Sequence, residues 1–100
     1  MTEYAKVPLT TPGEILLEEF IKPHEMNATQ LAAAIHVPTN RITSIVNGTR
    51  EITADTALRL GKFFGIEAAF WMNLQADYNL RTARLDADRM DDIEHIEQVA

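Results

Sequence analysis

Two short helical patterns follow each other closely near the middle of the chain, and their spacing constrains the fold more than any other feature. The first, "NATQLAAAIH", begins with Asn27 as an N-cap and has Gln30 in the position that closes a capping box. The second, "PTNRITSIVNG" (38–48), has Ile42 and Ile45 on its inner side. Two helices joined by a turn of about three or four residues predict a helix-turn-helix, whose second helix fits the major groove of DNA.

A window without carboxylates coincides with this pair of helices. From Met26 to Arg50 the chain has no Asp or Glu, although its net charge is −6. A carboxylate there would face a lattice of phosphates, whereas hydroxyl and amide groups can approach that lattice without repulsion. We therefore expect this surface to contact base edges and phosphate oxygens. The expected DNA-contact residues are Gln30, Thr39, Asn40, Arg41, Thr43, Ser44, Asn47, Thr49 and Arg50.

Each of these assignments has a purely structural alternative. The window can be the neutral surface of a helical bundle that binds no DNA. Gln30 closes a capping box whether or not it reaches a phosphate. Arg41 and Arg50 can pair with Glu51 or Asp55 in place of phosphates. The pattern alone leaves both sets of interpretations open.

The remaining sequence predicts an all-α domain. Capping residues and apolar spacing indicate further helices over residues 11–22, 53–65 and 67–85, which makes five in total. The segment 86–100 has a net charge of −5 and is poorly patterned, so we expect an acidic C-terminal tail after a domain formed by residues 1–85. A chain of 100 residues is long enough for one small domain.

Composition excludes several classes of protein. The chain has no cysteine, which fits a reducing cytoplasm and excludes thiolate metal sites. No apolar run approaches the roughly 20 residues that span a bilayer, and the N-terminal stretch lacks a charged-then-apolar pattern, so we expect no secretion signal. The three histidines are scattered, so we expect no metal site. No nucleophile–base pair or phosphate-binding glycine loop is present, and we expect neither an enzyme nor a cofactor.

Three stretches together are similar to a known family. "PGEILLEEF", "TQLAAAIHVPTNRITSIVNGTREITADTALRLGKFFG" and "FWMNLQADYNL" resemble the HigA-type antitoxins of addiction modules, within the wider Xre/Cro and lambda-repressor-like group. The resemblance spans residues 12–85. It implies a compact five-helix domain that binds operator DNA as a homodimer and restrains a HigB-type toxin, an mRNA-cleaving ribonuclease. Two residues depart from the family pattern, His36 in the turn and Glu67 at a helix cap. The turn position requires a positive φ, which His tolerates better than most residues.

Two further surfaces follow from the resemblance and from the residues. The helix over 67–85 carries more aromatic surface than one small core easily covers, and we expect Trp71, Leu74, Tyr78, Asn79 and Leu85 at a dimer interface. The alternative is that the first three belong to the core of the monomer. A toxin that binds RNA is expected to be basic, and two acidic segments suit it. These are the first helix, with Glu14, Glu18, Glu19 and Glu25, which we favour for direct contact, and the tail, with Asp86, Asp88, Asp91, Asp92, Glu94 and Glu97. Either segment can also be an ordinary solvated face.

Two other functions use the same domain. A stand-alone repressor of the Cro type would bind DNA through the same helix-turn-helix and would have no toxin partner. An interaction module would keep the helix pair without binding DNA. A small basic open reading frame beside the gene favours the antitoxin, and binding to the chain's own upstream region excludes the interaction module.

Overall fold

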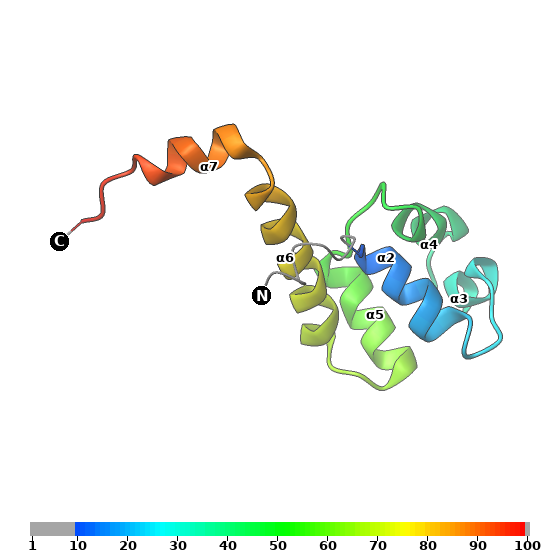
Figure 1. Cartoon of the computed structure of the whole chain (residues 1–100). Coiled ribbons are helices and arrows are strands. Elements are labelled where there is room, and N and C mark those ends of the chain that lie inside the picture. Colours follow the sequence, from blue (N-terminus) through cyan, green and yellow to red (C-terminus); the bar gives the residue numbers. More distant parts are fainter. Residues whose placement is uncertain (1–9, 100) are drawn as a thin grey trace.

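The computed structural model describes residues 10–99, which fold into helices alone (Figure 1). The helices are α2 (Pro12–Ile15), which continues directly into the π-helical segment η1 (Leu16–Ile21), α3 (Ala28–Ala34), α4 (Thr39–Val46), α5 (Ala54–Phe64), α6 (Ala68–Arg84) and α7 (Ala87–Glu94). This architecture confirms the predicted all-α class. It also confirms Thr11 as the N-cap of α2, because its hydroxyl accepts a hydrogen bond from the Glu14 N–H at 3.1 Å, whereas Thr53 is the N-cap of α5 without a side-chain cap bond.

One apolar core joins the helices from α2 to the first half of α6. Its buried members are Leu16, Ile21, Leu31, Ala32, Ile35, Ile42, Ile45, Ile52, Ala57, Leu60 and Trp71. Most of these side chains occupy positions that the helical spacing of apolar residues predicted. Burial of each large apolar side chain contributes about 1.5–3 kcal/mol relative to exposure. The core therefore fixes the position and orientation of α3 and α4.

Trp71 lies at the centre of this core, and its assignment to a dimer interface is wrong. Its exposed fraction is 0% within the single chain. Its ring packs against Phe20, with 4.7 Å between ring centroids, and against Phe70, with 5.0 Å. A residue enclosed in this way has no surface left for a second chain to contact. The alternative interpretation, in which the indole belongs to the monomer core, is confirmed for this residue.

A glycine in α2 allows this helix to lie directly against α4. A Cβ atom built on Gly13 would be 1.8 Å from the backbone oxygen of Ile45 and 2.9 Å from the Cα atom of Val46. Such distances are far below van der Waals contact, so only a residue without a side chain fits. The "PGE" stretch therefore sets the position of α4 against the rest of the domain.

The C-terminal segment differs from the prediction. Within residues 10–99 the chain forms six helices where we expected five, because α7 occupies the segment that we took for an acidic tail. The Asp86 side chain caps α7 by accepting a hydrogen bond from the Arg89 N–H at 3.1 Å. The signal was present in the sequence, since Met90 and Ile93 lie three residues apart, but the many carboxylates obscured it.

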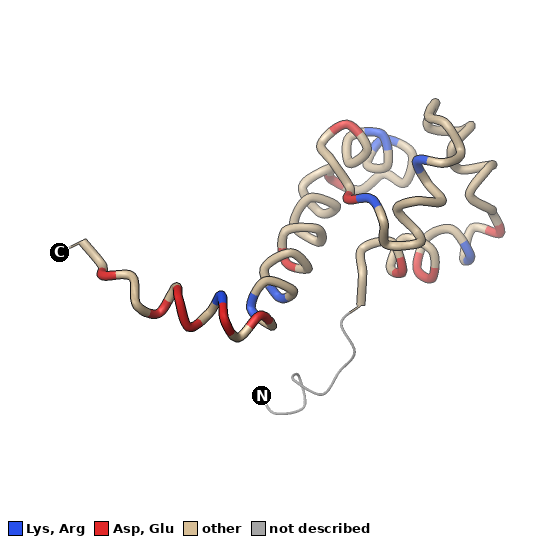
Figure 2. The backbone as a smooth tube through the Cα atoms, turned by 90° about the horizontal axis from the view of Figure 1, so that it is seen from above, with Lys and Arg blue, Asp and Glu red and all other residues tan. Residues whose placement is uncertain are grey.

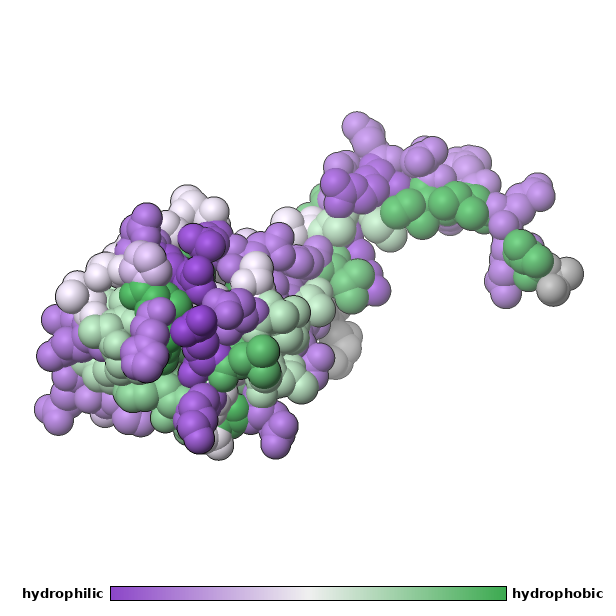
Figure 3. Space-filling model, turned by 180° about the vertical axis from the view of Figure 1, so that it is seen from behind, coloured by the Kyte–Doolittle hydropathy of each residue, from purple (hydrophilic) through white to green (hydrophobic). Residues whose placement is uncertain are grey.

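Helix α7 extends away from the domain and does not pack against the core (Figure 1). The radius of gyration is 16.3 Å, whereas a compact chain of this length has about 13 Å. Figure 3 shows apolar side chains gathered along one side of this helix and polar side chains along the other. Within the described residues, no helix has the length and apolar character needed to cross a bilayer.

Candidate nucleic-acid interface

Helices α3 and α4 form the helix-turn-helix that the sequence predicts. The capping box at the start of α3 is complete, with Asn27 Oδ1 accepting from the Gln30 N–H at 2.8 Å and Gln30 Oε1 accepting from the Asn27 N–H at 2.9 Å. The structure also resolves where α4 begins, because Pro38 is the N-cap and Thr39 is the first helical residue. The turn between them has His36 at φ +63°, which confirms the predicted positive φ.

The inner face of α4 belongs to the core, and its outer face carries the predicted polar groups. Ile42 and Ile45 are buried. The predicted contact residues on this helix divide by exposure: Thr39, Asn40 and Asn47 are exposed, whereas Thr43 and Ser44 are half-buried. The Thr43 hydroxyl donates to the Asn40 carbonyl at 3.3 Å, so its oxygen stays free to accept. Donors and acceptors without charge therefore line the outer side of α4 from its first turn.

Gln30 takes the capping role, and part of its side chain stays free of it. Its side-chain oxygen accepts from the Asn27 N–H, which confirms the capping role. An amide group has separate acceptor and donor atoms, so the Nε2 donor is not used by this bond. The side chain is exposed at the first turn of α3. The capping bond thus leaves one amide donor of Gln30 on the exposed first turn of α3.

The loop after α4 places the cationic side chain of Arg50 beside this surface. Gly48 ends α4 at φ +81°, and the Thr49 hydroxyl donates to the Ser44 carbonyl at 3.2 Å. Arg50 is exposed, and no hydrogen bond or ion pair of its side chain is found within residues 10–99. Its neighbour Glu51 instead accepts a hydrogen bond from Asn79 Nδ2 at 3.2 Å. The guanidinium of Arg50 is therefore available to a phosphate.

The charge distribution separates this surface from the acidic parts of the molecule. Figure 2 shows no acidic residue along α3 and α4, whereas α2–η1 and α7 carry several. At physiological salt the Debye length is about 8 Å, so the distant carboxylates of α7 are largely screened from α4. A chain with a net charge of −6 thus still offers one surface suited to a polyanion.

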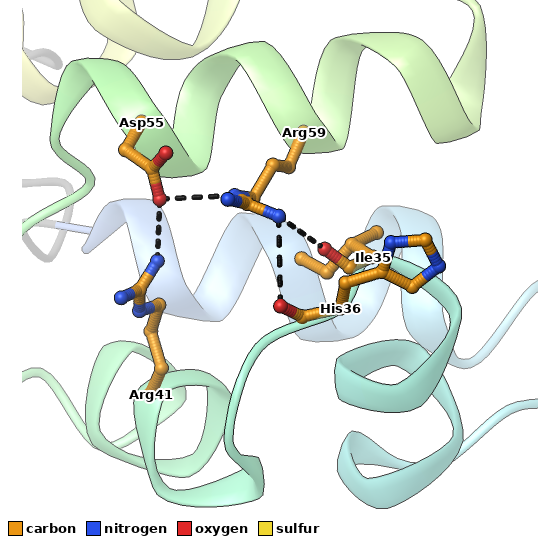
Figure 4. Close-up of polar contacts among 5 residues, drawn as sticks. All are labelled: Ile35, His36, Arg41, Asp55 and Arg59. Carbon is orange, nitrogen blue, oxygen red and sulfur yellow. Dashed lines mark hydrogen bonds and ion pairs between the residues drawn. The ribbon is translucent and has the colours of Figure 1, made fainter.

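A second arginine of the window has an internal partner. Arg41 Nη1 contacts Asp55 Oδ2 at 2.6 Å, and Arg59 Nε contacts the same oxygen at 3.0 Å (Figure 4). Hydrogen bonds from Arg59 and then from Arg41 hold the pKa of the Asp55 carboxyl below its ordinary value. The pairing of Arg41 with Asp55, one of the structural alternatives for this residue, is confirmed. The contribution of Arg59 was missed, although its spacing of four from Asp55 is a signal that the sequence contains.

Comparisons with known proteins agree with this geometry. A helix-turn-helix family model matches residues 17–71. Virulence-associated protein I of Dichelobacter nodosus is 49% identical over 81 residues, which cover 81% of this chain and 75% of the relative. The antitoxin HigA of Pseudomonas aeruginosa, solved with the higBA promoter, is 41% identical with a TM-score of 0.84, covering 93% of this chain and 100% of that one. The chain belongs to the HigA-type helix-turn-helix family.

A further solved member of the group is the antitoxin GraA in complex with its operator. It is 34% identical, with a TM-score of 0.83 and coverage of 94% of both chains. This family consists of DNA-binding regulators and not of enzymes. The similarity to DNA-bound members extends over α3 and α4 of this HigA-type chain and over the helices that position them.

The remaining dimer residues predicted for this HigA-type chain lie along α6. Leu74 packs against the core of its own chain, and Tyr78 is half-buried. Asn79 is exposed and accepts a hydrogen bond from Gln75 Nε2 at 3.0 Å. Leu85 caps the end of α6 and is 74% exposed. Along α6, the more accessible apolar side chains are therefore at its far end, not at its start.

The acidic candidates for toxin contact lie on two separate elements. On α2–η1 the side chains of Glu14, Glu18 and Glu19 are exposed, and Glu18 pairs with Lys22 at 2.9 Å. Glu25 follows in the next turn at φ +56°. On α7 every residue is exposed, including the carboxylates. Of these two elements, α7 is the one that combines its carboxylates with exposed large apolar side chains, Met90 and Ile93.

Proposed function

We propose that this chain is an antitoxin that represses its own operon as a DNA-binding dimer and neutralises a HigB-type mRNA-cleaving toxin. The observation that carries the DNA-binding half is the first turn of α4. There Thr39 and Asn40 are exposed and neutral, at the start of the second helix of the motif, and no carboxylate lies along α3 or α4. In a helix-turn-helix, these N-terminal residues of the second helix contact base edges.

The proposed DNA contacts fall into two groups. Thr39, Asn40 and Thr43 would face base edges, because they lie along the outer side of α4. The backbone contacts would come from both ends of the motif and from the loop that follows it. These residues are Gln30, Ser44, Asn47, Thr49 and Arg50.

A homodimer would place two such motifs on one operator. Half-sites one turn of duplex apart require the two second helices to be separated by about 34 Å. The far end of α6 and the apolar side of α7 supply the exposed surface for this contact, with Leu85, Met90 and Ile93 as its apolar residues. Tyr78 and Asn79 lie next to it on α6.

A basic ribonuclease partner fits the acidic elements. An active site that attracts RNA has a positive potential, and a carboxylate-rich helix increases the rate of encounter with it. Both α2–η1 and α7 carry exposed carboxylates that suit this contact. The proposal of a toxin partner rests on family membership together with this charge distribution.

The experiment that tests the DNA-binding half is operator binding by Ala variants. Replacement of Thr39 or Asn40 should cost about 1–3 kcal/mol of operator affinity when a base contact is lost. An Asn73→Ala variant on the exposed side of α6 is the matched control and should bind normally. Unchanged affinity for all the α4 variants would contradict the assignment of this face.

Co-purification with the product of the neighbouring gene tests the antitoxin half. A stable complex in which the partner's ribonuclease activity is lost supports the proposal. If the chain binds its operator but no neighbouring protein, it is a stand-alone Cro-like repressor.

A further inference from the structure

Asp55 connects the second helix of the motif to the helix that follows it. The carboxylate is in the first turn of α5, and its Oδ2 atom accepts from Arg41 on α4 and from Arg59 one turn further along α5 (Figure 4). We call Arg41, Asp55 and Arg59 the Asp55 cluster. A carboxylate in the first turn of a helix also interacts favourably with the helix dipole. One oxygen atom thus holds groups from two helices together.

The same cluster reaches the turn between α3 and α4. Arg59 Nη1 donates to the Ile35 carbonyl at 3.1 Å and to the His36 carbonyl at 3.5 Å (Figure 4). Carbonyls at the end of a helix lack partners within that helix. A non-glycine residue at positive φ, such as His36, is strained and keeps this conformation only when its surroundings hold it. Arg59 therefore stabilises the turn that sets the direction of α4.

The Arg41 side chain is mostly buried and pairs with Asp55 on α5. Its side chain is 24% exposed, and its Nε atom is buried without a hydrogen-bond partner in the described part of the chain. A phosphate that drew this guanidinium outward would compete with its 2.6 Å contact to Asp55. In contrast, Arg50 is exposed and needs to break no such contact. The two arginines of the carboxylate-free window are thus not equivalent.

From this geometry we infer that Asp55 is a positioning residue for DNA binding, and that Arg41 acts through Asp55 and not as a phosphate contact. The cluster fixes the first turn of α4 against α5 and the turn, and so places Thr39 and Asn40 for the major groove. This inference rests on the proposed operator binding, and it replaces the expectation that Arg41 contacts DNA.

The sign of the effect at Asp55 separates positioning from simple electrostatics. Removal of a carboxylate near a polyanion should strengthen binding if only charge matters. If Asp55 positions α4, Asp55→Asn should instead weaken operator binding, by about tenfold if one base contact is lost. Asp77→Asn is the matched control, because Asp77 also pairs with an arginine four residues away, at 3.0 Å on α6. This control should not weaken binding.

Salt dependence then distinguishes the roles of the two arginines. Each phosphate contact contributes about 0.9 to the slope of log affinity against log salt concentration. Arg50→Gln should lower this slope by about that amount, whereas Arg41→Gln should weaken binding and leave the slope unchanged. Because Arg41 and Asp55 act through one contact, the double variant should be little weaker than either single variant. A slope lowered equally by Arg41→Gln, or tighter binding by Asp55→Asn, would overturn the inference.

A measurement without DNA keeps this test separate from the proposed function. Amide hydrogen exchange should show faster exchange at the Val37 and Arg41 N–H groups in Asp55→Asn than in Asp77→Asn, because their bonds to the Ala32 and Pro38 carbonyls form the turn. Absence of operator binding by the unmodified chain would contradict the proposed function. Unchanged exchange in Asp55→Asn would contradict the positioning role, whether or not the chain binds DNA.

Discussion

The Gln75 side chain on α6 accepts a hydrogen bond from the backbone N–H of Ile52 at 2.8 Å, deep inside the domain. Both residues are buried, with exposed fractions of 6% for Gln75 and 1% for Ile52. Through Nε2 the same amide donates to Asn79 at 3.0 Å, and Asn79 in turn donates to Glu51. This polar chain joins α6 to the loop that leads from α4 to α5. It gives a structural reason for the glutamine in "FWMNLQ".

Replacement of Gln75 by leucine should therefore destabilise the domain. The change leaves the buried Ile52 N–H without an acceptor, which costs about 1–3 kcal/mol of the free energy of unfolding. Chemical denaturation followed by circular dichroism measures this loss. Asn73→Leu, on the exposed side of the same helix, is the control and should change the free energy of unfolding by less than about 0.5 kcal/mol. Equal stability of the two variants would contradict the role of the buried bond.

Gly13→Ala should be among the most disruptive substitutions in the chain. The new Cβ atom would lie 1.8 Å from the Ile45 oxygen, and because the Cβ is fixed to the α2 backbone and the oxygen belongs to the α4 backbone, α2 and α4 must move apart. Overpacking of this kind costs about 1–3 kcal/mol or more, and the shift of α4 should also weaken operator binding. Thermal unfolding and operator titration measure the two effects.

Gly65→Ala is the matched control for this substitution. Gly65 has φ +70° but no atom within 4 Å of the added Cβ. Alanine in the left-handed region costs about 1–2 kcal/mol for backbone reasons alone. This variant should therefore lose stability and retain operator affinity per folded molecule. If Gly13→Ala also bound the operator normally, α2 would not determine the position of α4.

The Asp55 cluster gives a prediction about pH. Arg59 and Arg41 hold the pKa of Asp55 below its ordinary value of 3.8, so the folded chain favours the charged carboxylate more than the unfolded chain does. Its contribution to stability is then fully present above the unfolded pKa and is lost as the pH falls through the lower folded value. The difference in melting temperature between the original chain and Asp55→Asn should stay constant from about pH 5 to 8. It should shrink only below the ordinary pKa, and a change near neutral pH would point to another group.

How far the sequence predicts the structure depends on whether a feature is local. The capping box between Asn27 and Gln30, the positive φ of His36 and the buried Ile42 follow from spacing within one or two turns, and all three are confirmed. Pairing across elements does not follow from spacing. Glu51 and Asp55 were equivalent partners for Arg41 until the packing of α4 on α5 brought Asp55 to 2.6 Å.

The errors have the same origin. The apolar stripe containing Trp71 is correct, but a stripe does not tell whether its own domain or a second chain covers it. Here the side chains of Phe20 and Phe70 enclose the indole. In α7 and its flanks, six carboxylates over residues 86–97 conceal the helical spacing of Met90 and Ile93. Net charge indicated solvation of the segment, whereas its periodicity indicates an amphipathic helix.

Helix α7 has one apolar side and one acidic side. An isolated helix of eight residues is marginal in water, so this one requires contacts beyond itself. Ala87, Met90 and Ile93 form its apolar side, while Asp88 and Asp92 lie on the opposite side, one turn apart. If the apolar side forms the proposed dimer contact, Met90→Ser together with Ile93→Ser should weaken dimerisation in analytical ultracentrifugation.

The acidic side of α7 provides both the control and the second half of the test. Asp88→Asn together with Asp92→Asn should leave the dimer intact, because these side chains point away from the apolar contact. The same variant should weaken toxin binding in calorimetry if α7, and not α2–η1, faces the basic partner. Deletion of residues 86–100 should reproduce both defects. Unchanged toxin affinity after the deletion would assign that contact to the carboxylates of α2–η1, where Glu14 and Glu19 are exposed and have no ion-pair partner within the described residues.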